Sequence, residues 1–256
     1  MKRIVIKIGT KILTTSSHKL DLNNLRRLVN EISSLHAEGI ECILVSSGSI
    51  TCGSEILNIQ PKSMPQKQAS ASVGQLLLLR EYQQFFTQNN LNIGQILLTQ
   101  DILDNETKQI NVTNTINTLL SHHIIPIINE NDSVSTEEIQ FGDNDILASI
   151  VARICDVDLL AILTDADGLY DKNPQTNSDA SFIFELSHIS DDMIKDASDA
   201  LSSSSKGGMK SKLIASRAAL DCGIPTVIAN GRHHLPLKDI LLEKKGGTWF
   251  TPEKKS

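Results

Sequence analysis

The sequence predicts an α/β fold, a three-layer αβα sandwich whose middle layer is a mostly parallel sheet. Short aliphatic runs alternate with longer amphipathic stretches along the chain. The composition, 40% hydrophobic but only 4% aromatic, fits an aliphatic core. Glycine, hydroxyl and acidic residues follow most of the aliphatic runs. Alternation of this kind places helices on both faces of a parallel sheet, and ligands beyond the carboxyl ends of its strands.

The strands are predicted from six runs rich in β-branched and aliphatic residues, which are typical of strands buried on both faces. The runs are 3–8, 41–46, 93–99, 124–129, 159–164 and 225–229.

An amphipathic helix is predicted over residues 21–38, with Gly39 placed to end it. The residues expected on its buried face are Leu22, Leu25, Leu28, Val29, Ile32 and Leu35.

Several classes of function are excluded by composition. A net charge of −6 and few aromatic residues argue against a nucleic-acid partner. The apolar part of "MKRIVIKIG" is too short for a signal peptide or a membrane span, so we expect no membrane association and a cytoplasmic protein. The four cysteines are far apart and the histidines lack metal-ligand spacing, so neither a disulfide framework nor a protein-held metal is expected.

The loops that follow the predicted strands carry the chemistry. They read "KIGTKIL", "SSGSITCG", "NENDSVSTEEIQFGDND" and "TDADGLY". Each loop alone could be a simple turn, but together they gather at one edge of the sheet. A further segment, "SSSSKGGMKSK", is either a flexible linker or a phosphate grip at a helix start.

These loops supply the parts needed for phosphoryl transfer. The P-loop, G-x-G-x-x-G and G-x-S-x-G motifs are absent. Cations and acids are present instead, as Lys7, Lys212, Asp132, Asp143, Asp145 and Asp165. Phosphoryl transfer depends on cations and hydrogen-bond donors around the moving phosphate. Asp143 and Asp145 are open to two interpretations, since an aspartate at a helix start can also be only a cap.

The order and spacing of the motifs resemble the glutamate 5-kinase family of the amino acid kinase superfamily. The motifs are "VIKIGTKIL", "VSSGSI", "KQASASVGQ", "IIPIINENDSV", "FGDND", "TDADGLY" and "KGGMKSK". The resemblance implies one amino acid kinase domain over 1–256. It also implies ATP-dependent phosphorylation of the γ-carboxylate of L-glutamate to L-glutamyl 5-phosphate, the first step of proline biosynthesis. Two alternatives remain: a kinase of the same fold acting on another carboxylate, carbamate or phosphate, and a ligand-binding sensor without turnover.

The resemblance also assigns roles to individual residues. Lys7, Asp145 and Lys212 are expected to be catalytic, with Lys7 contacting the transferring phosphate and Asp145 holding both lysines. The residues expected to bind glutamate are Ser47, Asp132 and Asn144. Those expected to bind ATP, besides Lys7, are Thr164, Asp165, Lys206, Gly207, Gly208, Met209, Lys210, Ser211 and Lys212.

Further expectations concern cofactors and partners. Mg²⁺ is expected to accompany ATP, and proline to act as a feedback inhibitor. A homodimer or homotetramer and a hand-over of product to glutamate-5-semialdehyde dehydrogenase are also implied. The chain is expected to be a short form without the C-terminal PUA domain that many relatives carry. It also carries Lys206 where they have threonine, after a run of serines where they have glycine.

Overall fold

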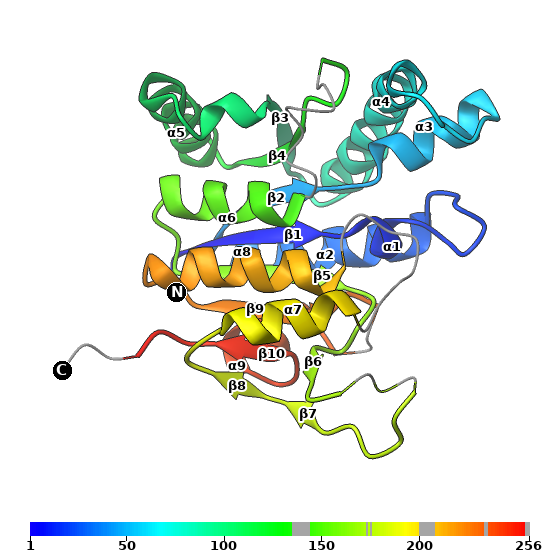
Figure 1. Cartoon of the computed structure of the whole chain (residues 1–256). Helices are drawn as coiled ribbons and strands as arrows, with labels where there is room; N and C mark the ends of the chain where they lie inside the picture. The colour runs from blue at the N-terminus through cyan, green and yellow to red at the C-terminus, as the bar shows by residue number, and fades with distance from the viewer. Residues whose placement is uncertain (135–143, 173, 175, 200–207, 233–234, 254–256) are drawn as a thin grey trace.

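The fold is an α/β sandwich, as the sequence predicts, seen here in a computed structural model (Figure 1). The structure describes residues 1–256 except 135–143, 173, 175, 200–207, 233–234 and 254–256. Within these residues an eight-stranded sheet forms the middle layer. Its strand order is β3 (Asn92–Leu98), β4 (Ile124–Glu130), β2 (Glu41–Ser46), β1 (Arg3–Ile8), β5 (Leu159–Thr164), β9 (Thr226–Asn230), β10 (Thr248–Phe250) and β8 (Glu185–Leu186).

The six strands from β3 to β9 pair in parallel, so their carboxyl ends share one edge of the sheet. Strand β10 is antiparallel to β9 and parallel to β8. A separate short ribbon pairs β6 (Leu169–Tyr170) with β7 (Phe182–Ile183). The short strands near the end of the chain were not predicted, because two or three residues carry no readable alternation.

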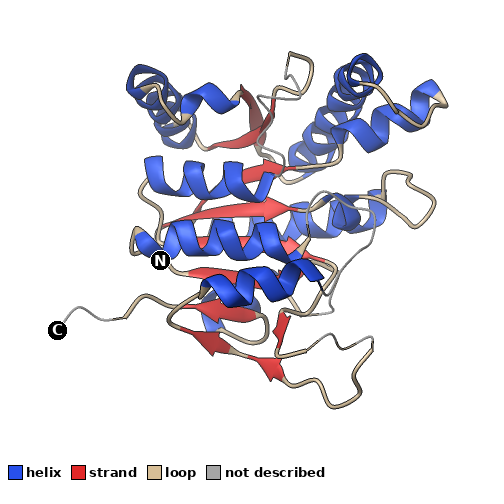
Figure 2. Ribbon diagram, in the orientation of Figure 1, coloured by secondary structure: helices blue, strands red, loops and turns tan. Residues whose placement is uncertain are grey.

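Helices cover both faces of the sheet (Figure 2). One core joins the sheet to α1 (Thr10–Leu13), α2 (Leu22–Ala37), α4 (Met64–Gln88) and α9 (Leu237–Glu243). The opposite core joins it to α5 (Glu106–Ser121), α6 (Asn144–Ile154), α7 (Asp191–Asp199) and α8 (Met209–Asp221). The remaining elements are α3 (Ser49–Leu57) and the short 3₁₀ helix η1 (Gln100–Ile102).

Alternation along β1 determines which side chains meet which helices. Ile4, Ile6 and Ile8 belong to the core beneath α2 and α4, whereas Val5 belongs to the core beneath α6 and α8. Because successive side chains of a strand point to opposite faces, Lys7 shares the face of Val5. The sequence therefore directs this lysine toward α6 and α8.

Helix α2 follows its predicted range closely. Asp21 is the N-cap, its carboxylate accepting the backbone N–H of Asn24 at 3.1 Å. Gly39, with φ +85°, follows the helix end as expected. The prediction that Leu22 is buried was wrong, since its side chain is 43% exposed. It occupies the first helical position, before the apolar face reaches the core.

Helices α3 and α4 pack with their backbones in direct contact. A Cβ placed on Gly53 would lie 1.7 Å from the carbonyl oxygen of Ser70, and one on Gly74 would lie 1.8 Å from that of Ser49. Only glycine allows this approach. The first turn of α3 is thereby fixed against the middle of α4.

Candidate active site

Asp145 lies at the centre of the site and holds two lysines from distant parts of the chain. Its Oδ1 is 2.5 Å from Lys7 Nζ, and its Oδ2 is 3.0 Å from Lys212 Nζ. Asp145 is 0% exposed, Lys7 3% and Lys212 4%. Three buried charged groups therefore converge where β1, α6 and α8 meet.

The local sequence explains this meeting. Lys7 points toward α6 and α8 by strand alternation, and Asp145 lies in the first turn of α6. Gly208 is the N-cap of α8, so Lys212 falls in the first turns of that helix. Ser211 Oγ lies 3.0 Å from Asp145 Oδ2 and 2.9 Å from the Gly208 carbonyl oxygen.

The electrostatics favour an ionised Asp145. Burial works to raise the pKa of this carboxyl, but the ammonium groups of Lys7 and Lys212 outweigh it and hold the pKa below its usual value. A buried ion pair adds little to the stability of the fold, because the free-energy cost of removing two charges from water offsets their attraction. Both carboxylate oxygens of Asp145 face lysine ammonium groups.

Asn144, the residue before Asp145, begins a second cluster of polar groups. Its Nδ2 lies 2.7 Å from the Ser46 carbonyl oxygen, 2.7 Å from Asn129 Oδ1 and 3.2 Å from Ser47 Oγ. Gly48, with φ +96°, supplies the left-handed residue that turns the chain from β2 into α3. The structure thus brings Asn144 and Ser47, two predicted glutamate ligands, into contact.

Asp132, the third predicted glutamate ligand, joins the same cluster through α3. Ser49 Oγ donates to Asp132 Oδ2 at 3.2 Å. Asn129 Nδ2 lies 3.4 Å from Ser49 Oγ and 2.7 Å from Gln75 Oε1. Asn129, Ser49 and Gln75 were not predicted as site residues, although each lies within a motif that the sequence analysis quoted.

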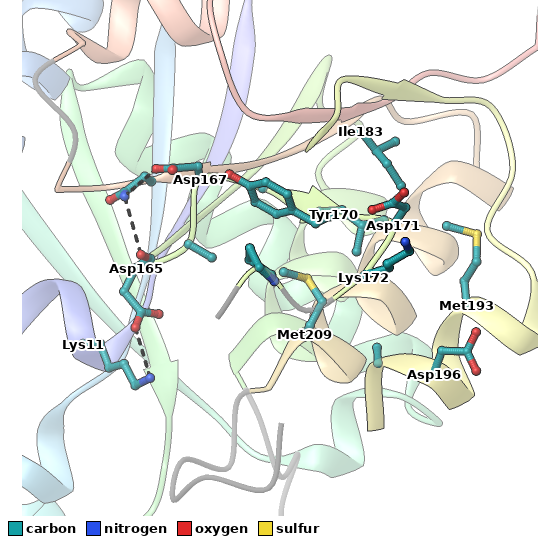
Figure 3. A pocket seen from close by; sticks show the side chains of 16 residues that line it. Lys11, Asp165, Asp167, Tyr170, Asp171, Lys172, Ile183, Met193, Asp196 and Met209 are labelled. Carbon is teal, nitrogen blue, oxygen red and sulfur yellow. Dashed lines mark hydrogen bonds and ion pairs between the residues drawn. The ribbon is translucent and has the colours of Figure 1, made fainter. Parts of the chain in front are cut away.

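A cavity of about 630 Å³, within the range of small-molecule sites, lies at the carboxyl ends of β5 and β9 and at the start of α8. Figure 3 shows Lys11 and Asp165 at one end of it and Met193 and Asp196 at the other. The lining residues are Lys11, Asp165, Ala166, Asp167, Gly168, Leu169, Tyr170, Asp171, Lys172, Pro174, Ile183, Met193, Asp196, Ala197, Met209 and Asn230.

Lys11 is the cation nearest to Asp165 in this cavity. Its Nζ lies 3.0 Å from Asp165 Oδ2, as the dashed line in Figure 3 marks. Burial works to raise the pKa of Asp165, but the Lys11 ammonium lowers it overall. Lys11 was not predicted as a site residue, although it lies within the motif "VIKIGTKIL" that the sequence analysis quoted.

The predicted ATP ligands divide into three groups. Asp165 and Met209 line the cavity. The described residues that do not line it are Lys7, Thr164, Gly208, Lys210, Ser211 and Lys212, of which Lys210 is exposed. Lys206 and Gly207 lie outside the described residues, as does Asp143.

Within the described part of the chain, no three acidic, histidine or cysteine side chains come together as a metal site. Every described helix is too short or too polar to reach across a lipid bilayer.

The chain belongs to the amino acid kinase family, whose model matches residues 2–230. Solved structures agree on the fold. Carbamate kinase from Giardia lamblia bound to AMP-PNP superposes with a TM-score of 0.69 at 16% identity, over 98% of this chain and 99% of that one. UMP kinase from Bacillus anthracis gives a TM-score of 0.65 at 16% identity, over 98% and 96%.

Within this family the chain belongs with the glutamate 5-kinases. It is 42% identical to Glutamate 5-kinase of Clostridium acetobutylicum, over 100% of this chain and 96% of that relative. It is 43% identical to Glutamate 5-kinase of Caldanaerobacter subterraneus, over 98% of this chain and 68% of that relative.

Proposed function

We propose that this protein phosphorylates the γ-carboxylate of L-glutamate with ATP, giving L-glutamyl 5-phosphate in the first step of proline biosynthesis. The observation that carries the proposal is the Asp145 carboxylate, which holds Lys7 and Lys212 next to the polar cluster that Asn144 begins. Curated relatives over the whole chain are glutamate 5-kinases, which supports the same reaction.

The reaction needs no general base. A glutamate side chain has a pKa of about 4.3, so the attacking oxygen is already an anion at neutral pH. A γ-carboxylate oxygen forms a bond to the terminal phosphorus of ATP, the bond from that phosphorus to the bridging oxygen breaks, and ADP leaves. The barrier lies in bringing two anions together. Lys7 and Lys212 offset this repulsion in a buried site, and Asp145 keeps both in place.

ATP occupies the cavity lined by Asp165, Tyr170 and Met209, with its phosphates toward Lys7 and Lys212. Thr164 and the segment from Lys206 to Lys212 complete the nucleotide side. Mg²⁺ arrives on the phosphates of the nucleotide, since this ion prefers phosphate oxygens and water to an all-protein cage.

Glutamate binds to the polar cluster of Ser47, Asp132 and Asn144. Proline shares the ammonium and carboxylate groups of glutamate's α-carbon, so it competes for the same cluster and acts as a feedback inhibitor. The four cysteines are free, as expected for the reducing cytoplasm, where both substrates are present.

Assembly and product transfer complete the proposal. Leu76 on α4 and Ile56 on α3 are 76% and 54% exposed, and such apolar surface suits a homodimer or homotetramer. Because acyl phosphates hydrolyse readily, hand-over to glutamate-5-semialdehyde dehydrogenase protects the product.

Trapping the product as a hydroxamate tests the function. Purified protein with Mg-ATP, hydroxylamine and L-glutamate should form γ-glutamyl hydroxamate. Lys212→Met should abolish it, whereas Lys195→Met, at a lysine that is 74% exposed, should not. No product from glutamate, with turnover of N-acetylglutamate, carbamate or uridylate, would show that the acceptor is wrong.

A further inference from the structure

Gln75 contacts the acceptor cluster from the middle of α4 and has no role so far. Its Oε1 accepts from Asn129 Nδ2 at 2.7 Å. The residue before it is Gly74, where the backbones of α3 and α4 touch. Gln75 is therefore held against the first turn of α3 by a contact that leaves little freedom of position.

The side-chain amides of Asn144, Asn129 and Gln75 form a chain of hydrogen bonds. Two backbone groups determine which atom of each amide donates and which accepts. The carbonyl of Ser46 accepts from Asn144 Nδ2, and the backbone N–H of Glu130 donates to Asn129 Oδ1. Asn129 must therefore turn its Nδ2 toward Gln75. Because that nitrogen is a donor, Gln75 presents Oε1 to it and directs its own Nε2 elsewhere.

Gln75 Nε2 is a buried donor without a hydrogen-bond partner in the described structure. Leaving such a group unpaired costs about 1–3 kcal/mol, so unpaired buried donors are rare. A bound substrate is a natural acceptor here, because Ser49, Asn129 and Asp132 lie within the same hydrogen-bonded cluster.

The two ends of the amide chain differ in chemistry. Asn144 adjoins Asp145 and its two lysines, where phosphoryl transfer requires the γ-carboxylate. Gln75 lies two hydrogen bonds away from Asn144, at the opposite end. Asp132, linked to that end through Ser49, has the charge to bind an ammonium group. The α-carbon of glutamate, with its ammonium and carboxylate, belongs at the Gln75 end.

We infer that Gln75 Nε2 donates a hydrogen bond to the α-carboxylate of the acceptor amino acid, making Gln75 a specificity-determining residue. The inference rests on the proposed function. It explains why a glutamine amide at this position has a satisfied oxygen and an unpaired nitrogen.

Gln75→Glu separates this role from a purely structural one. The new carboxylate still accepts from Asn129 but offers no donor and repels the α-carboxylate. The KM for glutamate should rise about ten- to hundredfold, as expected for loss of a hydrogen bond to a charged group. The KM for ATP should stay within about twofold, since the nucleotide cavity does not include Gln75. Gln84→Glu, with the same change at an exposed position of α4, should match the wild type.

A second acceptor identifies the group that Gln75 binds. L-Isoglutamine keeps the γ-carboxylate but has a neutral amide in place of the α-carboxylate. Gln75→Glu should weaken isoglutamine much less than glutamate. Gln75→Met removes the donor without adding a charge, and it should also weaken glutamate more than isoglutamine. This variant replaces Gln75→Glu if Gln75→Glu fails to fold.

Each result decides the matter. A glutamate KM within about twofold of wild type would overturn the inference, because loss of a charged hydrogen bond costs more. Equal weakening of glutamate and isoglutamine would also overturn it, since Gln75 would then act only by holding Asn129. If the wild type itself neither binds nor phosphorylates glutamate, the proposed function fails together with the inference. If the wild type phosphorylates glutamate and the Gln75 variants have an unchanged glutamate KM, the inference about Gln75 fails and the proposed function stands.

Discussion

Lys7 and Asp145 form a buried ion pair, Nζ to Oδ1 at 2.5 Å, that joins the central strand of the sheet to α6. The other carboxylate oxygen of Asp145 is occupied by Lys212. One aspartate therefore fixes the spacing and direction of two ammonium groups. Its effect on the reaction comes through those lysines, because the anionic nucleophile needs no base.

Asp145→Asn should lower kcat by about 100- to 1,000-fold, the loss expected when one preorganised electrostatic group is removed. The changes in KM should be smaller, because the lysines act mainly on charge that develops in the transition state. The melting temperature should also fall, since two ammonium groups lose their buried counter-ion. Steady-state kinetics and thermal melts measure both effects.

Asp191→Asn is the matched control for that variant. Asp191 pairs with Arg217 at 2.6 Å, but its side chain is 77% exposed. Kinetics and melting temperature should therefore stay close to wild type. If Asp145→Asn kept full activity, the charge of Asp145 would not be needed to position the two lysines for the reaction.

Acid should erase the stabilising effect of Asp145. Its pKa is lowered in the folded state, because the lysines outweigh the opposing effect of burial. In the unfolded chain the pKa is about 3.9, so the contribution is complete above that pH and is lost as pH falls through the lower folded value. The difference in unfolding free energy between wild type and Asp145→Asn should therefore narrow below about pH 4. A difference that widened in acid would contradict the lowered pKa.

Gly74→Ala should disrupt the packing of α3 on α4. The added Cβ would lie 1.8 Å from the Ser49 carbonyl oxygen, so the two helices must separate. Overpacking of this kind costs about 1–3 kcal/mol or more. The melting temperature should drop and the glutamate KM should rise, because Ser49 and Gln75 move. Ser72→Ala, at an exposed position on the same helix, should change neither quantity.

Lys11→Ala should raise the KM for ATP by about two- to tenfold and leave that for glutamate unchanged. Lys11 pairs with Asp165 at the cavity, but both side chains are about half exposed, at 54% and 44%, which limits the effect. Lys19→Ala, at a 65% exposed lysine that pairs with Glu55, provides the control. An unchanged ATP KM would mean that Lys11 does not interact with the nucleotide.

The strands could be foreseen from the sequence pattern, whereas the pairing of Asp145 with Lys7 and Lys212 was expected only from the family resemblance. Aliphatic runs gave the six parallel strands to within about two residues, because parallel strands are buried on both faces. Within residues 4–8, Lys7 is the one charged residue among β-branched side chains, and alternation along the strand gives its direction. The position of a residue along a strand is therefore enough to predict the face of the sheet to which its side chain points.

Gln75 and Lys11 could not be foreseen in the same way. Gln75 lies deep inside α4, in a helix whose apolar residues are spread around its circumference, including an exposed Leu76. Its importance comes from Gly74 and from Asn129, which is far away in sequence. Lys11 gains its partner Asp165 only when β1 and β5 pair. Tertiary contacts of this kind leave no local pattern to read.

The two sides of the sheet correspond to the two halves of the chain, so they are also encoded by separate parts of the gene. From β1 the sheet extends through β2, β4 and β3 on one side, and through β5, β9, β10 and β8 on the other (Figure 1). The first side carries the groups proposed for the acceptor, and the second side surrounds the nucleotide cavity. Recombination after Asn144, at the start of α6, would therefore exchange the proposed acceptor groups together and retain the residues after position 164 that line the nucleotide cavity. A hybrid gene that joins the first half of one such kinase to the second half of another should inherit its choice of acceptor from the first parent.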